Sequence, residues 1–218
     1  MSPGVNIAAL VFDLGNVIVG IDFDRVFRAW GDHAGVPAHE IKAAFSFDAA
    51  YCAHERGELS IIEYCRSLRA TLGLSISDRQ LIDGWSKIFT GAVPGVAALL
   101  SRVDRSVPRY IFSNSNQTHY CQWIHEYATL LKDFRRVFVS SELGCRKPES
   151  VAFNRVLSAI EVSPERVMFF DDTKENADAA LRLGMVSVQV RSLRDIETGL
   201  AKAGLIPRAD QLSTTRSR

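Results

Sequence analysis

The sequence has few of the features that mark membrane, secreted or nucleic-acid-binding proteins. Its 218 residues include 26 Lys and Arg against 25 Asp and Glu, and a formal net charge of +1 gives no bulk attraction to nucleic acid or an anionic membrane. The longest mainly apolar run, residues 5–12, is too short for a bilayer-spanning helix, which needs about 20 residues. The first ten residues contain no Lys or Arg, whereas a secretory signal would. These absences predict a cytoplasmic protein with neither nucleic acid nor membrane as a partner.

Cysteine is scarce as well, and its spacing excludes the common cysteine-based sites. The four cysteines, Cys52, Cys65, Cys121 and Cys145, form no CxxC pair, so they indicate reduced thiols rather than a zinc ribbon or a redox motif. The motifs GxSxG, HExxH and GxGxxG are absent. Residues 15–20 have the glycine spacing of a phosphate-binding P-loop, but Ile21 stands where that loop requires lysine. The sequence therefore predicts none of these common nucleotide-binding or hydrolase sites.

The composition that remains is that of an ordinary globular protein, and its hydrophobic pattern divides the chain. Hydrophobic residues make up 47% and charged residues 23% of the sequence. Residues 7–12 form a continuous apolar run, as a strand buried on both faces would. From Asp22 to Gly91 the period is helical, with capping boxes at residues 60–63 and 77–80. The pattern predicts one strand followed by a helical insert of roughly 70 residues.

After Pro94, strand-like and helical segments alternate. We expect strands at residues 109–112, 137–140, 167–170 and 186–190, and helices at residues 96–103, 118–131, 149–160, 175–183 and 193–203. This alternation indicates βαβ units, and therefore an α/β fold whose parallel sheet has helices on both faces. We expect residues 1–18 and 92–207 to build the sheet unit, residues 19–91 the helical insert, and residues 208–218 a frayed polar tail.

Charged or small polar residues follow four of the predicted strands. The carboxyl ends of parallel strands meet at one edge of the sheet, and ligands bind there. Each residue alone has an ordinary structural interpretation as a strand end, a helix N-cap or a solvated loop residue. Their joint occurrence at successive strand ends favours a functional site. The residues are Asp13, Ser113, Asn114, Lys147, Asp171 and Asp172, with Asn176 shortly after the last pair.

The residue types in this set suit phosphate chemistry. Asp13 and one carboxylate of the adjacent pair 171–172 can bind Mg²⁺, a hard cation that prefers oxygen ligands. Ser113, the amides near Asn114 and the Lys147 ammonium can hold the remaining oxygens of a phosphate. Asp13 would then attack phosphorus and form an aspartyl-phosphate, from which water later releases inorganic phosphate.

With these motifs in this order, the sequence resembles the haloacid dehalogenase superfamily over residues 7–205. The helical insert is similar to the small helical cap that this superfamily places after its first strand. The resemblance implies a Rossmann-like sheet, a mobile cap and bound Mg²⁺. It also implies residue roles: Asp13 as nucleophile and metal ligand; Lys147 as a catalytic residue that holds phosphate with Ser113 and Asn114; Asp172 and the backbone carbonyl of Gly15 as further metal ligands; and Asp171, Asn176 and Asn16 as supporting residues.

Three segments, residues 13–19, 21–26 and 54–58, are similar to bacterial α-D-glucose-1-phosphate phosphatases of this superfamily. This resemblance implies a Mg²⁺-dependent phosphatase whose partner is a small phosphorylated metabolite, with a sugar phosphate such as glucose 1-phosphate as the expected substrate. Glu55 and Arg56 are the candidate contacts from the cap to that substrate. His54 and Glu58 instead fit a helix end, with Gly57 as the stop signal.

Gly15 departs from the pattern of most phosphatases in the superfamily, which have an aspartate there as general acid and base. General acid–base catalysis contributes typically ~10²–10⁴-fold, so metal, nucleophile and positioning can still sustain an enzyme, best with a good leaving group. Two alternatives stay open: a metal-independent 2-haloacid dehalogenase, which also lacks this aspartate, and a catalytically weak protein that binds a phosphometabolite. The carboxylate pair 171–172 favours the phosphatase, because a dehalogenase is not expected to retain it.

Overall fold

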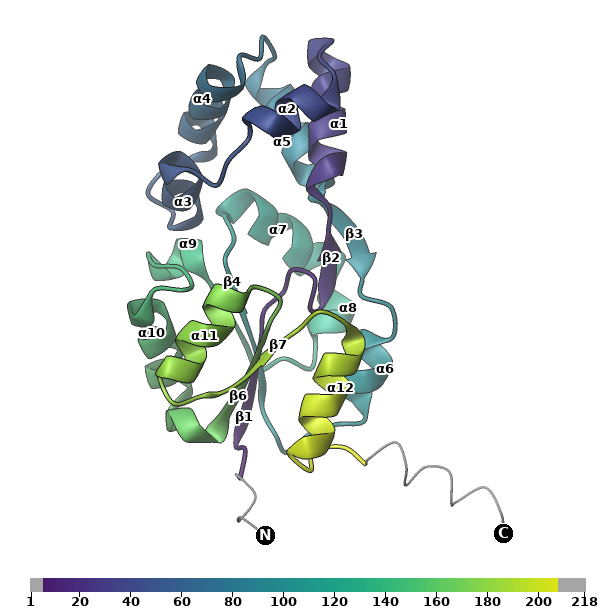
Figure 1. The fold of residues 1–218 in the computed structure, drawn as a ribbon, viewed down its shortest axis with the longest axis vertical. Coiled ribbons are helices and arrows are strands. Elements are labelled where there is room, and N and C mark those ends of the chain that lie inside the picture. The colour runs from purple at the N-terminus through teal and green to yellow at the C-terminus, as the bar shows by residue number, and fades with distance from the viewer. Residues whose placement is uncertain (1–5, 208–218) are drawn as a thin grey trace, which may run out of the picture.

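The described part of the chain, residues 6–207, folds into a sheet unit with a layer of helices beyond one end of it (Figure 1). In this computed structural model the sheet has five strands in the order β5-β4-β1-β6-β7. All neighbouring strands are parallel, which confirms the predicted α/β class. The strands are β1 (Ala9–Phe12), β4 (Arg109–Ser113), β5 (Arg136–Val139), β6 (Val167–Asp171) and β7 (Val186–Gln189). The predicted frayed tail, residues 208–218, lies outside the described residues.

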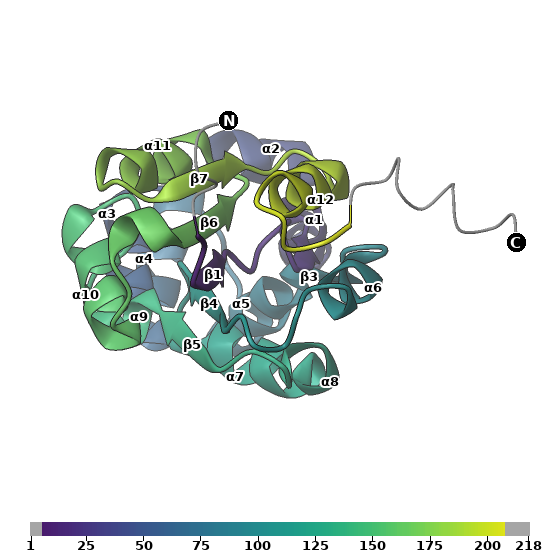
Figure 2. The same ribbon diagram turned by 90° about the horizontal axis from the view of Figure 1, so that it is seen from below.

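Alternation along the central strand β1 sends side chains into two separate cores. Leu10 and Phe12 belong to one core, together with helices α6 (Val96–Ser101), α7 (Gln117–Glu126), α8 (Ala128–Leu131) and α12 (Leu193–Lys202). Ala9 and Val11 belong to the other, with α10 (Ser150–Ile160) and α11 (Lys174–Arg182). Figure 2 shows the helices on the two faces of the sheet. Burial on both faces explains why residues 7–12 are continuously apolar.

The helical insert packs around a cluster of aromatic rings. Its helices are α1 (Phe23–Ala34), α2 (Ala38–Ala44), α3 (Ala49–Glu55), α4 (Ile61–Leu72) and α5 (Asp78–Trp85), followed by a 3₁₀ turn at Ser86–Ile88. Trp30 and Trp85 stack with ring centroids 5.7 Å apart at the centre of the cluster. Both predicted capping boxes are confirmed, because Ser60 with Glu63 and Ser77 with Gln80 exchange side-chain and backbone hydrogen bonds.

Two strands that the sequence pattern did not predict connect the insert to the sheet unit. Strands β2 (Val19–Ile21) and β3 (Phe89–Ala92) pair antiparallel, so the helical period was wrongly extended to Gly91. Strands this short carry too few residues for their period to be recognised. The predicted helix 118–131 is also divided, because Tyr127 separates α7 from α8. A short helix α9 (Ser140–Leu143) intervenes between β5 and Lys147, so Lys147 does not follow its strand directly. No helix within residues 6–207 is both long enough and apolar enough to cross a membrane.

Candidate active site

The carboxyl end of the sheet and the underside of the helical insert enclose a cavity of about 540 Å³. This volume falls in the usual range for small-molecule sites. Asp13 follows β1 directly, Ser113 ends β4 and Asp172 follows β6, so the strand ends converge on the cavity as predicted. Further site residues lining it are Gly15, Asn16, Asn114, Lys147 and Asn176.

Lys147 is the buried hub of the site, with a side chain only 1% exposed. Its Nζ donates to Asp13 Oδ1 at 2.8 Å, to Asp171 Oδ2 at 2.7 Å and to the backbone carbonyl of Phe112 at 2.7 Å. An ammonium group has three N–H donors, so these contacts use all of them. The two carboxylates raise the pKa of Lys147 against the opposing effect of burial, and Lys147 is therefore charged.

Asp171 is fully buried and satisfied by protein groups. Besides Lys147, it accepts from the Thr173 amide at 2.9 Å and from Asn176 Nδ2 at 3.0 and 3.2 Å. Its oxygens therefore have little capacity left for a ligand. Asp171 thus holds Lys147, and Asn176 holds Asp171; that the two residues support a reaction stays a prediction.

Asp172 faces the cavity and is held by Asn16. The Asn16 Nδ2 donates to Asp172 Oδ2 at 3.0 Å, and Asn16 Oδ1 accepts from the Ile21 amide at 3.1 Å. Asn16 has a left-handed backbone with φ of 54°, a conformation that asparagine tolerates better than most residues. The turn after β1 thus links Asp172 to the first strand of the connection.

Asp13, Asp171 and Asp172 offer carboxylate oxygens that lie within 4.8 Å of one another. Burial raises the pKa of Asp13 to about 7, and the charges of Asp171 and Asp172 add to this effect while Lys147 opposes it. Burial also raises the pKa of Asp172. When all three carboxylates are ionised, Lys147 balances one of the three negative charges and leaves two, which suits a divalent cation with a preference for oxygen ligands. Asp13 and Asp172 are the carboxylates free to hold it.

Gly15 lies in the turn beside Asp13, and its carbonyl accepts no hydrogen bond from the described residues. A Cβ atom at this position would lie 3.2 Å from Ile21 Cδ1 and 3.9 Å from Asp13 Oδ2. The carbonyl is thus available to a cation, as the resemblance implies. A Cβ atom would fit beside it after a small shift of the Ile21 side chain.

Ser113 and Asn114 differ in what they have to offer a phosphate. Ser113 lines the cavity, and its hydroxyl has only a 3.5 Å contact to the Asn114 carbonyl. The Asn114 side chain is already engaged, because it donates to the Lys147 carbonyl at 2.9 Å and accepts from the Lys147 amide at 2.8 Å. The Asn114 side chain therefore holds the Lys147 backbone and keeps one N–H donor of its amide for another acceptor.

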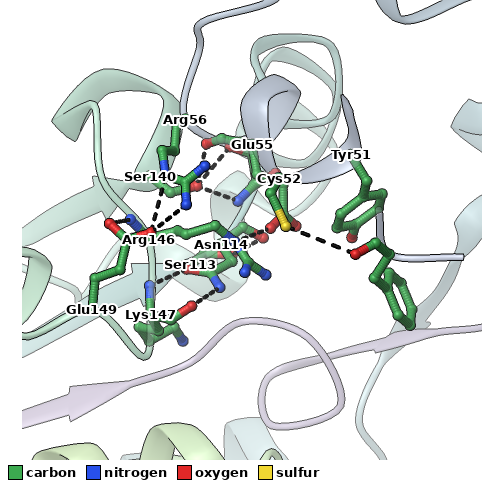
Figure 3. Close-up of polar contacts among 12 residues, drawn as sticks. Tyr51, Cys52, Glu55, Arg56, Ser113, Asn114, Ser140, Arg146, Lys147 and Glu149 are labelled. Carbon is green, nitrogen blue, oxygen red and sulfur yellow. Dashed lines mark hydrogen bonds and ion pairs between the residues drawn. The ribbon is translucent and has the colours of Figure 1, made fainter. Parts of the chain in front are cut away.

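Glu55 and Arg56, the two predicted contacts from the cap to the substrate, have different surroundings in the structure (Figure 3). Glu55 lines the cavity and pairs with Arg146 at 2.7 Å. Arg56 does not line it, and its guanidinium pairs with Glu149 at 2.6 Å instead. The structure therefore places Glu55, but not Arg56, within reach of a bound molecule.

Several residues of the cavity wall were missed by sequence reasoning. Phe23, Phe47 and Tyr51 form an aromatic wall on the insert, with centroid distances of 5.4 Å from Phe23 to Phe47 and 4.9 Å from Phe47 to Tyr51. Their spacing in sequence has no distinctive signature, because aromatic residues of a helical unit are usually core residues. Arg146 also lines the cavity, and its place next to Lys147 is the one signal that could have drawn attention to it.

A buried histidine, His119, joins the insert to the sheet unit at the wall of the cavity. Its ring stacks on Trp85 with centroids 4.8 Å apart. Its Nε2 lies 3.0 Å from the Trp85 carbonyl and its Nδ1 lies 3.2 Å from Asn116 Nδ2, which fits a neutral ring that donates from Nε2 and accepts at Nδ1. Burial lowers the pKa of His119 to about 4.

This shift predicts a specific loss of stability in acid. The folded-state pKa of His119 lies below the unfolded value near 6.5, so the neutral ring favours folding above pH 6.5 and the benefit is lost as the pH falls towards 4. In His119→Phe the ring stays but cannot titrate. Between pH 7 and pH 4.5, the free energy of unfolding should fall in both proteins. We expect the fall in His119→Phe to be smaller than that in the wild type by about 1–3 kcal/mol. Urea titrations at each pH measure the free energy of unfolding of both proteins. If it changed with pH equally in the variant and in the wild type, the prediction would be wrong.

Comparison with known proteins finds similarity over most of the chain. The family model described as haloacid dehalogenase-like hydrolase matches residues 7–184. D-ribitol-5-phosphate phosphatase of Bacteroides thetaiotaomicron is 24% identical over 185 residues, which cover 83% of this chain and 90% of that protein.

Solved structures share the fold. A haloacid dehalogenase family enzyme from Bacteroides thetaiotaomicron, in complex with magnesium and inorganic phosphate, has a TM-score of 0.73 at 24% identity and covers 86% of this chain and 96% of that one. L-2-haloacid dehalogenase from Xanthobacter autotrophicus, with chloropropionic acid covalently bound, has a TM-score of 0.64 at 19% identity, covering 92% and 85%. Because both identities are below 25%, these structures show that the chain shares their Rossmann-like fold.

Proposed function

We propose, since this chain belongs to the haloacid dehalogenase-like hydrolase family, that it is a Mg²⁺-dependent phosphatase acting on a small phosphorylated metabolite. The observation that carries the proposal is the charge arrangement around Asp13. One side of Asp13 is bound to Lys147, and Asp172 lies close enough to share a cation with it. The relative from Bacteroides thetaiotaomicron, named as a phosphatase, supports the same reaction class.

The reaction would proceed through Asp13. Its carboxylate attacks phosphorus, a bond forms between the carboxylate oxygen and phosphorus, and the bond from phosphorus to the leaving oxygen breaks. Water then attacks the aspartyl-phosphate, releasing inorganic phosphate and restoring the carboxylate. The positive charge of Lys147, beside Asp13, would stabilise the phosphate electrostatically although its three N–H groups are engaged, and the Ser113 hydroxyl can donate to a phosphate oxygen. Bound by Asp13, Asp172 and the Gly15 carbonyl, Mg²⁺ would neutralise charge on the phosphate and orient it.

The helical insert, residues 19–91, would serve as a cap over the catalytic core formed by residues 1–18 and 92–207. A cavity of about 540 Å³ suits a metabolite of sugar size. The aromatic wall can pack against the C–H face of a sugar ring, and Glu55 can accept hydrogen bonds from its hydroxyl groups. We therefore favour a sugar phosphate, with glucose 1-phosphate as the first compound to assay.

The direct test is phosphate release from a panel of phosphorylated metabolites, with Mg²⁺ and with EDTA. The proposal requires release from at least one sugar phosphate that is lost when Mg²⁺ is removed. Chloride release from 2-chloropropionate in EDTA would instead identify a dehalogenase. Tight binding of a sugar phosphate without turnover would identify a sensor of that metabolite.

Placing an aspartate at position 15 tests whether the glycine there leaves the site without a general acid. In Gly15→Asp the new side chain would lie near Asp13 and could protonate the leaving oxygen. We expect kcat to rise about tenfold or more for an alkyl phosphate, whose leaving group needs the proton, and by less than about threefold for p-nitrophenyl phosphate. Gly15→Asn, which has the same shape but no carboxyl proton, is the matched control. Equal changes for both substrates, or in both variants, would argue against a missing acid.

A further inference from the structure

We propose that Glu55 and Arg56, at the end of helix α3, are positioning residues that lock the helical insert onto the loop carrying Lys147. The structural part of this proposal concerns the closed contact itself, and its kinetic part rests on the phosphatase activity proposed above. Helix α3 lies above α9 in Figure 1, and Figure 3 shows Glu55 and Arg56 beside Arg146 and Glu149 of the loop 144–149. This contact is well removed along the chain from the β2–β3 connection.

Two ion pairs cross this contact with opposite polarity. The Glu55 carboxylate of the insert accepts from Arg146 Nε of the loop at 2.7 Å. The neighbouring Arg56 guanidinium of the insert donates from Nε and Nη2 to Glu149 Oε1 at 2.9 and 2.6 Å. Because the charges alternate on both sides, a shift that paired each residue with the wrong partner would bring like charges together. The two pairs therefore specify one register of the insert on the loop.

The backbones also approach closely at this contact. The Ser140 hydroxyl donates to the Glu55 carbonyl at 2.6 Å and accepts from the Ser115 amide at 2.9 Å, so it joins α3 to the end of β4. Gly57, with φ of +74°, lies against Ser141, and a Cβ atom on it would be 2.5 Å from the Ser141 carbonyl. Any side chain at position 57 would therefore push the insert away from the sheet unit.

The loop transmits this contact to the catalytic lysine. Arg146 and Lys147 are adjacent, yet Arg146 pairs with the insert while Lys147 pairs with Asp13 and Asp171. The Asn114 side chain holds the Lys147 backbone on both its amide and its carbonyl, which limits how the loop can move. Because Arg146 and Lys147 share a peptide bond, displacing Arg146 would pull the Lys147 backbone against this clamp and alter the three contacts of Nζ.

Burial distinguishes this lock from an ordinary surface ion pair. The Glu55 side chain is 6% exposed and that of Arg146 is 21% exposed, so their attraction is weakly screened by solvent. The pair Arg56–Glu149 is 28% and 32% exposed, and neither residue lines the cavity. A change at Arg56 or Glu149 therefore reaches a bound substrate only through the position of the insert and the loop.

Charge reversal at the second pair tests the lock kinetically. We expect Arg56→Glu and Glu149→Arg each to lower kcat/KM roughly three- to tenfold, and the double variant to recover to within about twofold of the wild type, because the pair is restored in reverse. The matched control is Arg102–Glu197 between α6 and α12, whose side chains are 32% and 39% exposed and lie outside the cavity. The same reversals there should leave kcat/KM unchanged. A double variant no better than the weaker single variant would overturn the proposal.

Hydrogen exchange on the full-length protein tests the lock without any turnover. The Lys147 amide, bonded to Asn114, should exchange at least about threefold faster in Arg56→Glu than in the wild type, and α3 amides should follow. Gly57→Ala should do the same, whereas Gly73→Ala, which has a similar φ of +64° but open space around it, should not. Unchanged exchange at Lys147 in both variants would overturn the proposal even if the phosphatase activity is confirmed. If no substrate is turned over but exchange accelerates, the lock stands and the proposed function fails.

Discussion

We expect Asp13→Asn to lose phosphate release almost completely, with a fall in kcat of at least about 10⁴-fold. An amide has nearly the same shape and can still accept the hydrogen bond from Lys147, but it is a poor nucleophile and a poor ligand for a hard cation. Phosphate release under saturating substrate and Mg²⁺ measures the effect. Turnover by Asp13→Asn equal to that of the wild type would refute the assignment of Asp13 as nucleophile.

The same variant should become more stable when metal is absent. The pKa of Asp13 is raised to about 7 in the folded protein, above its unfolded value of 3.8. The stability associated with its protonated form is present below pH 3.8 and lost as the pH rises through 7, so the charged carboxylate opposes folding at pH 8. We expect Asp13→Asn in EDTA at pH 8 to gain about 1–3 kcal/mol in free energy of unfolding.

The metal dependence of this gain provides its control. Adding Mg²⁺ should stabilise the wild type more than Asp13→Asn, because the cation binds the folded carboxylates and not the amide. Asp178→Asn removes an exposed carboxylate paired with Lys174 and should change neither stability nor its Mg²⁺ dependence measurably. A loss of stability in Asp13→Asn under these conditions would show that Lys147 outweighs burial and the neighbouring carboxylates.

Replacing Lys147 with methionine should have the opposite effect on stability and should also lower activity severely. Methionine fills a similar volume, but it leaves Asp13 and Asp171 buried without their shared counter-charge. Breaking a buried pair in this way typically costs about 3–5 kcal/mol. We also expect kcat to fall about 10³-fold or more, because the ammonium no longer stabilises the phosphate. Urea unfolding in EDTA and phosphate release measure the two effects.

Two further variants keep this prediction decisive if Lys147→Met does not fold. Lys147→Arg retains the positive charge, but a planar guanidinium cannot reproduce three contacts made from one nitrogen atom, so activity should still fall while most stability is kept. Lys174→Met removes an exposed lysine and should alter stability by less than about 0.5 kcal/mol. If Lys147→Arg were fully active, positive charge rather than placement would be the requirement.

The parts of the fold that could be predicted are those with long or continuous patterns. The buried run at residues 7–12 and the alternation after Pro94 gave the class and the parallel sheet, because burial on both faces leaves a plain apolar signature. Strands β2 and β3 could not be found in this way. Each is held by its antiparallel partner about 70 residues away, and that pairing leaves no local period.

In the candidate site, too, some features could be predicted from the sequence and others could not. The placement of Asp13 and Asp172 directly after β1 and β6 was predictable, because apolar runs in the sequence indicate where buried strands end. The engagement of Asn114 with the Lys147 backbone, and of Arg56 with Glu149, could not be predicted. Both contacts join segments that only the folded chain brings together, and asparagine or arginine on a loop has many ordinary uses.

The connection through β2 and β3 also bears on how such an enzyme could diversify. The chain leaves the sheet unit at Val19 and returns at Ala92, and these two residues are paired neighbours. The two ends of residues 19–92 therefore lie side by side. This segment can be lengthened, shortened or exchanged without interrupting any strand of the five-stranded sheet. If the insert selects the substrate as proposed, evolution could change the substrate by altering residues 19–91 and leave the residues around Asp13 unchanged.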